Sequence, residues 1–293
     1  MDQKSGVTTT TPPAIPLRAL GASGIHIPAL GVGTNRWGFR KEGADRLTPV
    51  YSAALDAGAN LFDTAEVYLG SEKAIGDCIR HDPRPVYLVS KFAPYPTRLS
   101  FKSFHKALEG TLTRLGIPTI DLYLIHFPFS PMGIASLMDV LAEVARAGIV
   151  RAVGVSNFST KQMYFAANQL ERHGIPLAAN EVHFSIFHRD PERNGILEAC
   201  RKLDVTLIAY RPLAGGRNRQ NGTTLDRALA GIAIARQKTA AQVALNWLLH
   251  KDEHIVAIPG TTNVVHLREN IGAIGWVLND DELTSLEQSS ARL

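Results

Sequence analysis

Four side chains that could move protons lie at or just beyond the ends of separate apolar runs. Asp63 ends the run NLFD, Tyr68 follows it in the same segment, Lys91 lies in VYLVSKF, and His126 lies in DLYLIHF. A phenol is a weak acid near neutrality, and an adjacent ammonium lowers its pKa by favouring the phenolate. An aspartate beside the lysine keeps the ammonium charged, and the histidine can donate a hydrogen bond to a carbonyl oxygen. The set predicts a proton-donating site for an oxygen that becomes an alkoxide, and such a site still needs a source of hydride.

Strands and helices that alternate along the chain would bring these side chains together. The eight predicted strands are 29–33, 60–64, 86–92, 121–127, 152–158, 179–184, 206–210 and 255–260, with one longer gap before the last. Amphipathic helical stretches lie between them, which predicts a parallel sheet because each strand needs a crossover helix. Eight such units favour a (β/α)8 TIM barrel, in which chemistry collects at the C-terminal ends of the strands. An open doubly wound sheet would carry a GxGxxG turn after its first strand, and GVGTNRWG has the wrong glycine spacing.

Several flanking features complete this prediction. RALGASGIHIPAL, before the first strand, predicts an N-terminal β-hairpin that closes the bottom of the barrel, with its turn at 22–24. Asn279 followed by Glu282 is a capping pattern that predicts an extra C-terminal helix. Residues 1–16 are expected to form a flexible lead, and residues 17–293 a single barrel domain. Glycines that precede strands are expected to cap helices in the left-handed conformation; these are Gly58, Gly116, Gly148 and Gly174.

Composition limits the class of protein. The chain has 293 residues, 45% of them hydrophobic, and a net charge of +4 from scattered basic residues, which argues against nucleic-acid binding. Cys78 and Cys200 have no metal-ligand spacing and are expected to be buried, reduced thiols. No apolar run approaches the roughly 20 residues of a membrane span. The N-terminus lacks a secretory or transit pattern, so we expect a cytoplasmic protein that makes no membrane contact and is a monomer or weak homo-oligomer.

From about residue 17 to the end, the sequence resembles the aldo-keto reductase family. The resemblance rests on GANLFDTAEVY, SK at 90–91, IDLYLIHFP, VRAVGVSNFS, AYRPL, AQVALNWLL and IPGT…HLREN, which occur in the family's order. It implies a (β/α)8 barrel that binds a nicotinamide cofactor without a Rossmann fold. It also implies a catalytic tetrad of Asp63, Tyr68, Lys91 and His126, the same four residues reached from the strand ends. Glu66 is expected to be a solvated loop residue.

The resemblance also implies a set of cofactor contacts, with some departures. Ser156 and Asn157 match the pair that holds the nicotinamide carboxamide. Glu181 replaces the usual glutamine, Phe184 takes the place of the aromatic that stacks under the ring, and Arg211 replaces a serine beside the pyrophosphate. The full implied set is Gly33, Thr34, Ser156, Asn157, Glu181, Phe184, Tyr210, Arg211, Leu213, Gly260, Thr262, His266, Glu269 and Asn270.

The resemblance also bears on the choice between NADP and NAD and on the substrate. His266 stands where NADPH-preferring relatives often have arginine, and Gly260 where they have lysine; we favour NADP, with NAD as the alternative. A helix that begins near Asn263 would direct its positive end towards phosphate. The substrate pocket for a small carbonyl compound is expected to include Trp37, Phe92 and Phe127, with Phe129 nearby.

Two other functions compete with carbonyl reduction. A regulatory subunit could keep the barrel and the cofactor with little catalysis, but the complete tetrad favours an enzyme. The second alternative is a barrel enzyme of another class, such as a metal-dependent hydrolase or an isomerase. It would need clustered histidine and aspartate metal ligands, such as HxH at a strand end, and the sequence has no such motif.

Overall fold

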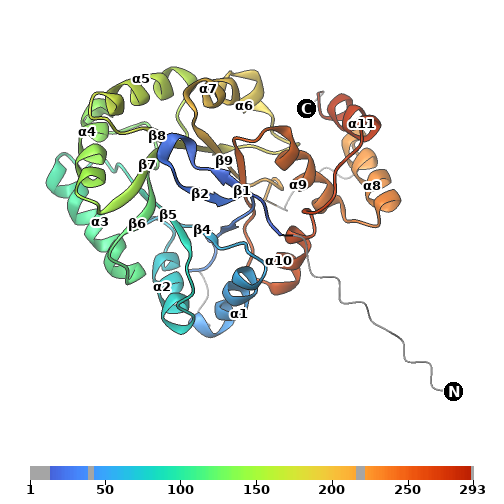
Figure 1. Cartoon of the computed structure of the whole chain (residues 1–293), viewed down its shortest axis with the longest axis horizontal. Coiled ribbons are helices and arrows are strands. Elements are labelled where there is room, and N and C mark those ends of the chain that lie inside the picture. The colour runs from blue at the N-terminus through green and yellow to red at the C-terminus, as the bar shows by residue number, and fades with distance from the viewer. Residues whose placement is uncertain (1–13, 39–42, 216–221, 292–293) are drawn as a thin grey trace.

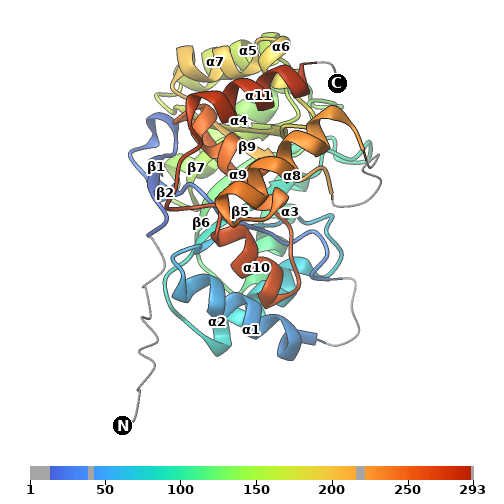
Figure 2. The same cartoon turned by 90° about the vertical axis from the view of Figure 1, so that its right-hand side faces the viewer.

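The structure is a computed structural model that describes residues 14–38, 43–215 and 222–291. Most of the predicted N-terminal lead, residues 1–13, lies outside this part of the chain. Figure 1 shows a central sheet ringed by helices, and Figure 2 shows the same arrangement from the side.

All eight predicted strands are present, and they run parallel in one sheet in sequence order. They are β3 (Val32–Gly33), β4 (Leu61–Asp63), β5 (Tyr87–Phe92), β6 (Ile120–Ile125), β7 (Val150–Ser156), β8 (Leu177–His183), β9 (Thr206–Tyr210) and β10 (Ile255–Ile258). The sheet closes on itself through bridges that join Leu30 to Ala257 and Gly33 to Gly260. Closure leaves no free edge, and the predicted barrel is confirmed.

The helices lie around the barrel and account for the longer gap before the last strand, which holds two of them. They are α1 (Gly43–Asp56), α2 (Ser71–His81), α3 (Phe101–Leu115), α4 (Gly133–Arg146), α5 (Thr160–Glu171), α6 (Asp190–Arg193), α7 (Ile196–Leu203), α8 (Thr224–Arg236), α9 (Ala240–Lys251), α10 (Val264–Ile271) and α11 (Asp280–Ser290). The four predicted capping glycines all have φ between 71° and 76°, a conformation that glycine adopts without steric cost. No helix in the described ranges is long and apolar enough to cross a membrane.

Side chains alternate between the inside of the barrel and the surrounding helices. On β4, Leu61 belongs to a small cluster inside the barrel, whereas Phe62 belongs to the larger core beneath the helices. On β5, Val89 lies inside and Leu88 outside in the same way. This period of two decides which residues at each strand end can reach the mouth.

The predicted hairpin covers the N-terminal end of the barrel. Strands β1 (Leu17–Ala19) and β2 (His26–Pro28) pair antiparallel, and a 3-10 turn (Gly21–Ser23) joins them. The Gly21 N–H donates to Thr206 Oγ1 at 2.8 Å, at the first residue of β9. Leu20 and Ile27 pack into the inner cluster, so this end of the barrel is plugged. In Figure 1 the hairpin lies in front of the central strands.

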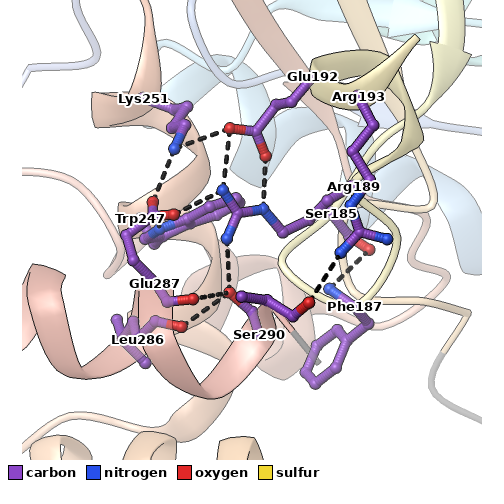
Figure 3. A network of polar contacts seen from close by, with 11 residues as sticks. Ser185, Phe187, Arg189, Glu192, Arg193, Trp247, Lys251, Leu286, Glu287 and Ser290 are labelled. Atoms are coloured by element: carbon purple, nitrogen blue, oxygen red, sulfur yellow. Dashed lines mark hydrogen bonds and ion pairs between the residues drawn. The ribbon is translucent and has the colours of Figure 1, made fainter. Parts of the chain in front are cut away.

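The C-terminal helix α11 is also confirmed, with its predicted Asn279–Glu282 capping box. It is docked on α6 and α9 by the polar network in Figure 3. Glu287 of α11 accepts hydrogen bonds from Trp247 Nε1 at 3.0 Å and Lys251 Nζ at 2.6 Å. Arg189, just before α6, pairs with both Glu192 and Glu287. Arg189 and Lys251 each pair with both carboxylates, and Arg193 adds a third cation that donates to the Ala291 carbonyl at 3.4 Å, so the network ties the end of the chain to α6 and α9.

Candidate active site

Lys91 is the centre of a buried charged cluster at the C-terminal end of the barrel. Its side chain is 0% exposed, and its ammonium donates to an Asp63 carboxylate oxygen and, at 2.9 Å, to the Thr64 carbonyl. The same Nζ lies 3.2 Å from Glu181 Oε2 and 5.2 Å from the centre of the Tyr68 ring. Burial by itself would lower the pKa of Lys91, but Asp63 and Glu181 raise it overall, so the ammonium stays charged.

The alternation along the strands explains why these groups meet. Asp63 and Lys91 each lie two residues beyond an inward-facing apolar side chain, Leu61 and Val89 respectively. Glu181 follows Ala179 on β8 with the same spacing. The three polar groups therefore form a layer inside the barrel above the apolar one. Desolvation in this layer makes their mutual interactions strong.

His126 lies beside Tyr68 at the end of β6. The two ring centres are 5.8 Å apart and nearly perpendicular, and the histidine is 6% exposed. Burial and the Lys91 charge lower the pKa of His126 to about 3, so the imidazole is neutral at physiological pH. Its buried Nδ1 has no hydrogen-bond partner among the described residues. A neutral ring has one N–H to donate, as a carbonyl oxygen requires.

The protonation of Tyr68 differs from the sequence-based prediction. The Lys91 charge does favour the phenolate, but burial has the larger effect, and the pKa of Tyr68 is raised overall. The prediction of a lowered phenol pKa is therefore wrong for the free protein. Tyr68 keeps its proton, which is the state a proton donor needs before reaction.

Ser156 and Asn157 form a polar pair at the end of β7. The Asn157 amide nitrogen donates to Ser156 Oγ at 3.0 Å and to the His126 carbonyl at 3.1 Å, and its oxygen accepts from the Tyr210 hydroxyl at 2.9 Å. Asn157 has φ of 62°, an unusual conformation that the surrounding bonds hold in place. The half-buried Tyr210 ring therefore lies beside this pair, inside the mouth.

Three aromatic residues do not lie where the sequence placed them. Phe184 is 0% exposed and packs edge-on against Trp247 of α9, so it presents no face for stacking. Phe92 is also 0% exposed and packs against Phe104, and Trp37 is 2% exposed. These residues face the helices, which corrects their assignment to cofactor stacking and to an open substrate pocket. Tyr210, by contrast, is a half-buried strand-end aromatic beside the Ser156–Asn157 pair.

Phe127 and Phe129, by contrast, are exposed at the mouth. Phe127 is 42% exposed and stacks nearly parallel on His126, with 4.3 Å between ring centres. Phe129 is 80% exposed. Apolar surface next to the polar cluster suits the organic part of a carbonyl compound.

Thr34 links the end of β4 to the start of α2. Its hydroxyl donates to the Asp63 carbonyl at 2.7 Å and lies 2.7 Å from Ser71 Oγ, and the residue is 0% exposed. The predicted cofactor contact of Thr34 stays a prediction. Gly33 lies against β10, where an added Cβ would come within 2.8 Å of the Ile258 carbonyl oxygen.

The residues predicted for the adenosine end lie together around the start of α10. Asn263 caps this helix by accepting from Val265 N at 2.7 Å. Asn270 is 5% exposed, whereas His266 and Arg268 are exposed. The others in this group are Gly260, exposed, and Thr262 and Glu269, both half-buried. The helix start and the exposed guanidinium of Arg268 give this region the character of an anion site.

The ends of β8 and β9 carry a stack of three rings that the sequence did not suggest. Tyr210 stacks on His183, and His183 stacks on His188, with 5.5 and 4.0 Å between ring centres. Arg211 has φ of 48° and is exposed, while Leu213 is half-buried against the core. Alternation along β8 was the available signal, because it puts His183 on the same face as Glu181.

Glu66 is not a solvated loop residue, as the sequence had suggested. Its side chain is only 8% exposed and forms an ion pair with Arg98. Its Oε1 also accepts from the Ala93 N–H at 2.6 Å. Glu66 therefore ties the segment that carries Tyr68 to the segment after β5. No group of three or more histidine, cysteine or acidic residues placed to hold a metal occurs in the described ranges.

Comparisons of the sequence with known proteins identify reductases. The model of the Aldo/keto reductase family matches residues 29–291. Pyridoxal reductase from the chloroplast of Arabidopsis thaliana is 32% identical, over 98% of this chain and 90% of its own length. A methylglyoxal reductase of Escherichia coli is 30% identical, over 90% of this chain and 92% of its own.

Solved structures give the same result. The thermostable aldo-keto reductase Tm1743, in complex with the inhibitor epalrestat, has a TM-score of 0.85 and 35% identity, covering 94% of this chain and 99% of its own. An aldo/keto reductase from Klebsiella pneumoniae, in complex with NADP and acetate, has a TM-score of 0.81 and 27% identity, covering 92% and 94%.

Proposed function

Since this chain belongs to the aldo/keto reductase family, we propose that it reduces an aldehyde or ketone to an alcohol, with Tyr68 as the proton donor. The observation that carries the proposal is the convergence of Asp63, Tyr68, Lys91 and His126, from three segments of the chain, onto one buried site. Aldehydes are the first substrates to test, since pyridoxal and methylglyoxal reductases are among the relatives.

The residues at the mouth fit a nicotinamide dinucleotide, and we favour NADPH. Ser156 and Asn157 would hold the carboxamide, and the half-buried Tyr210 ring would stack on the nicotinamide. The start of α10 would bind the phosphate end, with His266 exposed beside it. When bound, this cofactor supplies the hydride that the protein side chains lack.

The chain's own residues account for the rest of the reaction. The neutral His126 donates a hydrogen bond that orients and polarises the carbonyl oxygen. Tyr68 gives its hydroxyl proton to that oxygen as it gains negative charge. The Lys91 ammonium stabilises the phenolate left behind, and Asp63 holds the ammonium in place.

Absorbance of the reduced nicotinamide, followed with NADPH and NADH and a panel that includes pyridoxal and methylglyoxal, tests the proposal directly. Tyr68→Phe should lower kcat by about 10²–10⁴-fold, the usual contribution of a general acid, while cofactor binding persists. Tyr164→Phe is the matched control, because Tyr164 is 41% exposed on α5. Cofactor binding without turnover of any carbonyl compound would favour a regulatory subunit instead.

A further inference from the structure

Glu181 has no role in the reaction described above, yet it is part of the charged cluster. It belongs to the inward-facing row of β8, is 1% exposed, and lies with Oε2 at 3.2 Å from Lys91 Nζ. That oxygen accepts no hydrogen bond from the described residues. Lys91 is already paired with Asp63, so two carboxyl groups share one ammonium.

The charges around Glu181 do not balance if both carboxyls are ionised. The titratable groups that interact with Glu181 or with its partner Lys91 are Asp63, Tyr68, Lys91, His126 and Tyr210. Tyr68 and Tyr210 have raised pKa values and His126 is neutral, so Lys91 is the one cation in this set. Two ionised carboxylates would leave an unpaired negative charge in a desolvated site, which is strongly unfavourable.

One of the two carboxyls must therefore keep a proton at neutral pH. Asp63 accepts the direct hydrogen bond from Lys91, whereas Glu181 lies farther from the ammonium. Burial and the Asp63 charge raise the pKa of Glu181 well above its usual range. The geometry and the charge count thus assign the proton to Glu181.

We propose that Glu181 is a proton store for carbonyl reduction and acts through Lys91. The inference rests on the proposed function. Tyr68 loses its O–H proton to the alkoxide oxygen. Lys91 then transfers an N–H proton to the phenolate oxygen, and Glu181 transfers its O–H proton to the Lys91 nitrogen.

The transfers leave Tyr68 and Lys91 as they began and Glu181 ionised. One proton enters the alcohol and one leaves Glu181, so the balance is complete without solvent during the chemical step. Ionised Glu181 is favoured once the cofactor is oxidised, because the oxidised nicotinamide carries a positive charge. A proton from solvent restores Glu181 before the next turnover.

Infrared spectroscopy of the cofactor-free protein tests the stored proton without any turnover. At about pH 7, the wild type should show the C=O stretch of a protonated carboxyl, which a carboxylate lacks. Glu181→Gln should lose this band. Glu66→Gln, which replaces another buried carboxylate paired with a cation, should keep it. Absence of the band in the wild type, its persistence in Glu181→Gln, or a wild-type band that ¹³C labelling of the glutamate carboxyls does not shift would overturn the assignment.

Calorimetry in buffers of different ionisation enthalpy measures whether Glu181 releases its proton when the oxidised cofactor binds. Binding of NADP⁺ should release about one proton per site from the wild type and close to none from Glu181→Gln. The two proteins should also differ in the shape of the pH profile of kcat. If Glu181 had a purely structural role, its replacement would lower kcat by the same factor at every pH. Parallel profiles and equal proton release would refute the store. A protein that keeps the infrared band and the proton release but reduces no carbonyl compound would refute the proposed reaction and leave the Glu181 proton established.

Discussion

Replacement of Lys91 by methionine tests the electrostatic description of the site. The substitution keeps the apolar volume and removes the ammonium that Asp63 and Glu181 share in a fully buried position. Loss of one partner from a buried ion pair leaves an uncompensated charge, at a cost of about 3–5 kcal/mol in the free energy of unfolding. The Thr64 carbonyl, which accepts from Lys91 at 2.9 Å, also loses its donor.

The loss of unfolding free energy in Lys91→Met should increase with pH. Without the ammonium, the pKa of both carboxyls rises further, so the folded protein binds protons that the unfolded chain has released. Stability then falls as pH rises above the pKa of an unfolded carboxyl, about 4. The loss of unfolding free energy in Lys91→Met should therefore be smallest near pH 5 and largest near pH 8. Near pH 8 it should approach the full cost of the buried charge, about 3–5 kcal/mol.

Urea unfolding at the two pH values, followed by circular dichroism, measures this effect. Lys73→Met is the matched control, because the side chain of Lys73 is 69% exposed and its pair with Asp77 lies on the surface of α2. The control should lose less than about 1 kcal/mol at either pH. The double variant Lys91→Met/Asp63→Asn should recover part of the loss. A defect of Lys91→Met that is equal at both pH values, or no larger than that of the control, would refute the reasoning.

Three further substitutions test other parts of the structure. His266→Arg should strengthen the preference for NADPH over NADH, because a guanidinium is always charged and can pair with the 2′-phosphate in a bidentate way. Fluorescence titration measures the two Kd values, and an unchanged ratio contradicts a phosphate contact at this position. Arg98→Met should leave the Glu66 carboxylate without its cation, which should lower the free energy of unfolding in urea by about 1–3 kcal/mol. It should also lower kcat, because the segment that carries Tyr68 loosens. An unchanged kcat would show that the Glu66–Arg98 ion pair does not position Tyr68. Asn279→Ala should cost about 1 kcal/mol through loss of the α11 cap, and unchanged urea unfolding would show that the cap does not stabilise the protein.

Much of the fold is local enough to be predicted from the sequence. Alternation of strands and helices predicted the parallel barrel, because a parallel strand cannot follow its neighbour without a crossover. Strands β7 and β8 begin two residues earlier than predicted, at Val150 and Leu177, since sheet pairing extends them. The Asn279 cap is specified by side chains within one helical turn, and the sequence identified it correctly.

The tertiary structure decided which strand-end residues face the mouth. Phe92, Phe184 and Tyr210 are all aromatics at strand ends, and the sequence treated all three as contacts for a ligand. Only the inward row of each strand reaches the interior, so Tyr210 remains at the mouth and the other two join the core. A shift of one residue in the assumed phase reverses this result, and short apolar runs do not determine the phase.

The sequence by itself determined which proton-transferring groups the protein has and the fold that gathers them, because motifs and periodicity are local properties of the chain. The surroundings of those groups were decided only by the closed barrel. Burial raises the pKa of Tyr68 despite Lys91, and Glu181 shares the ammonium with Asp63. Desolvation and charge pairing depend on atoms far apart in sequence, so they exist only once the strands have closed into a barrel.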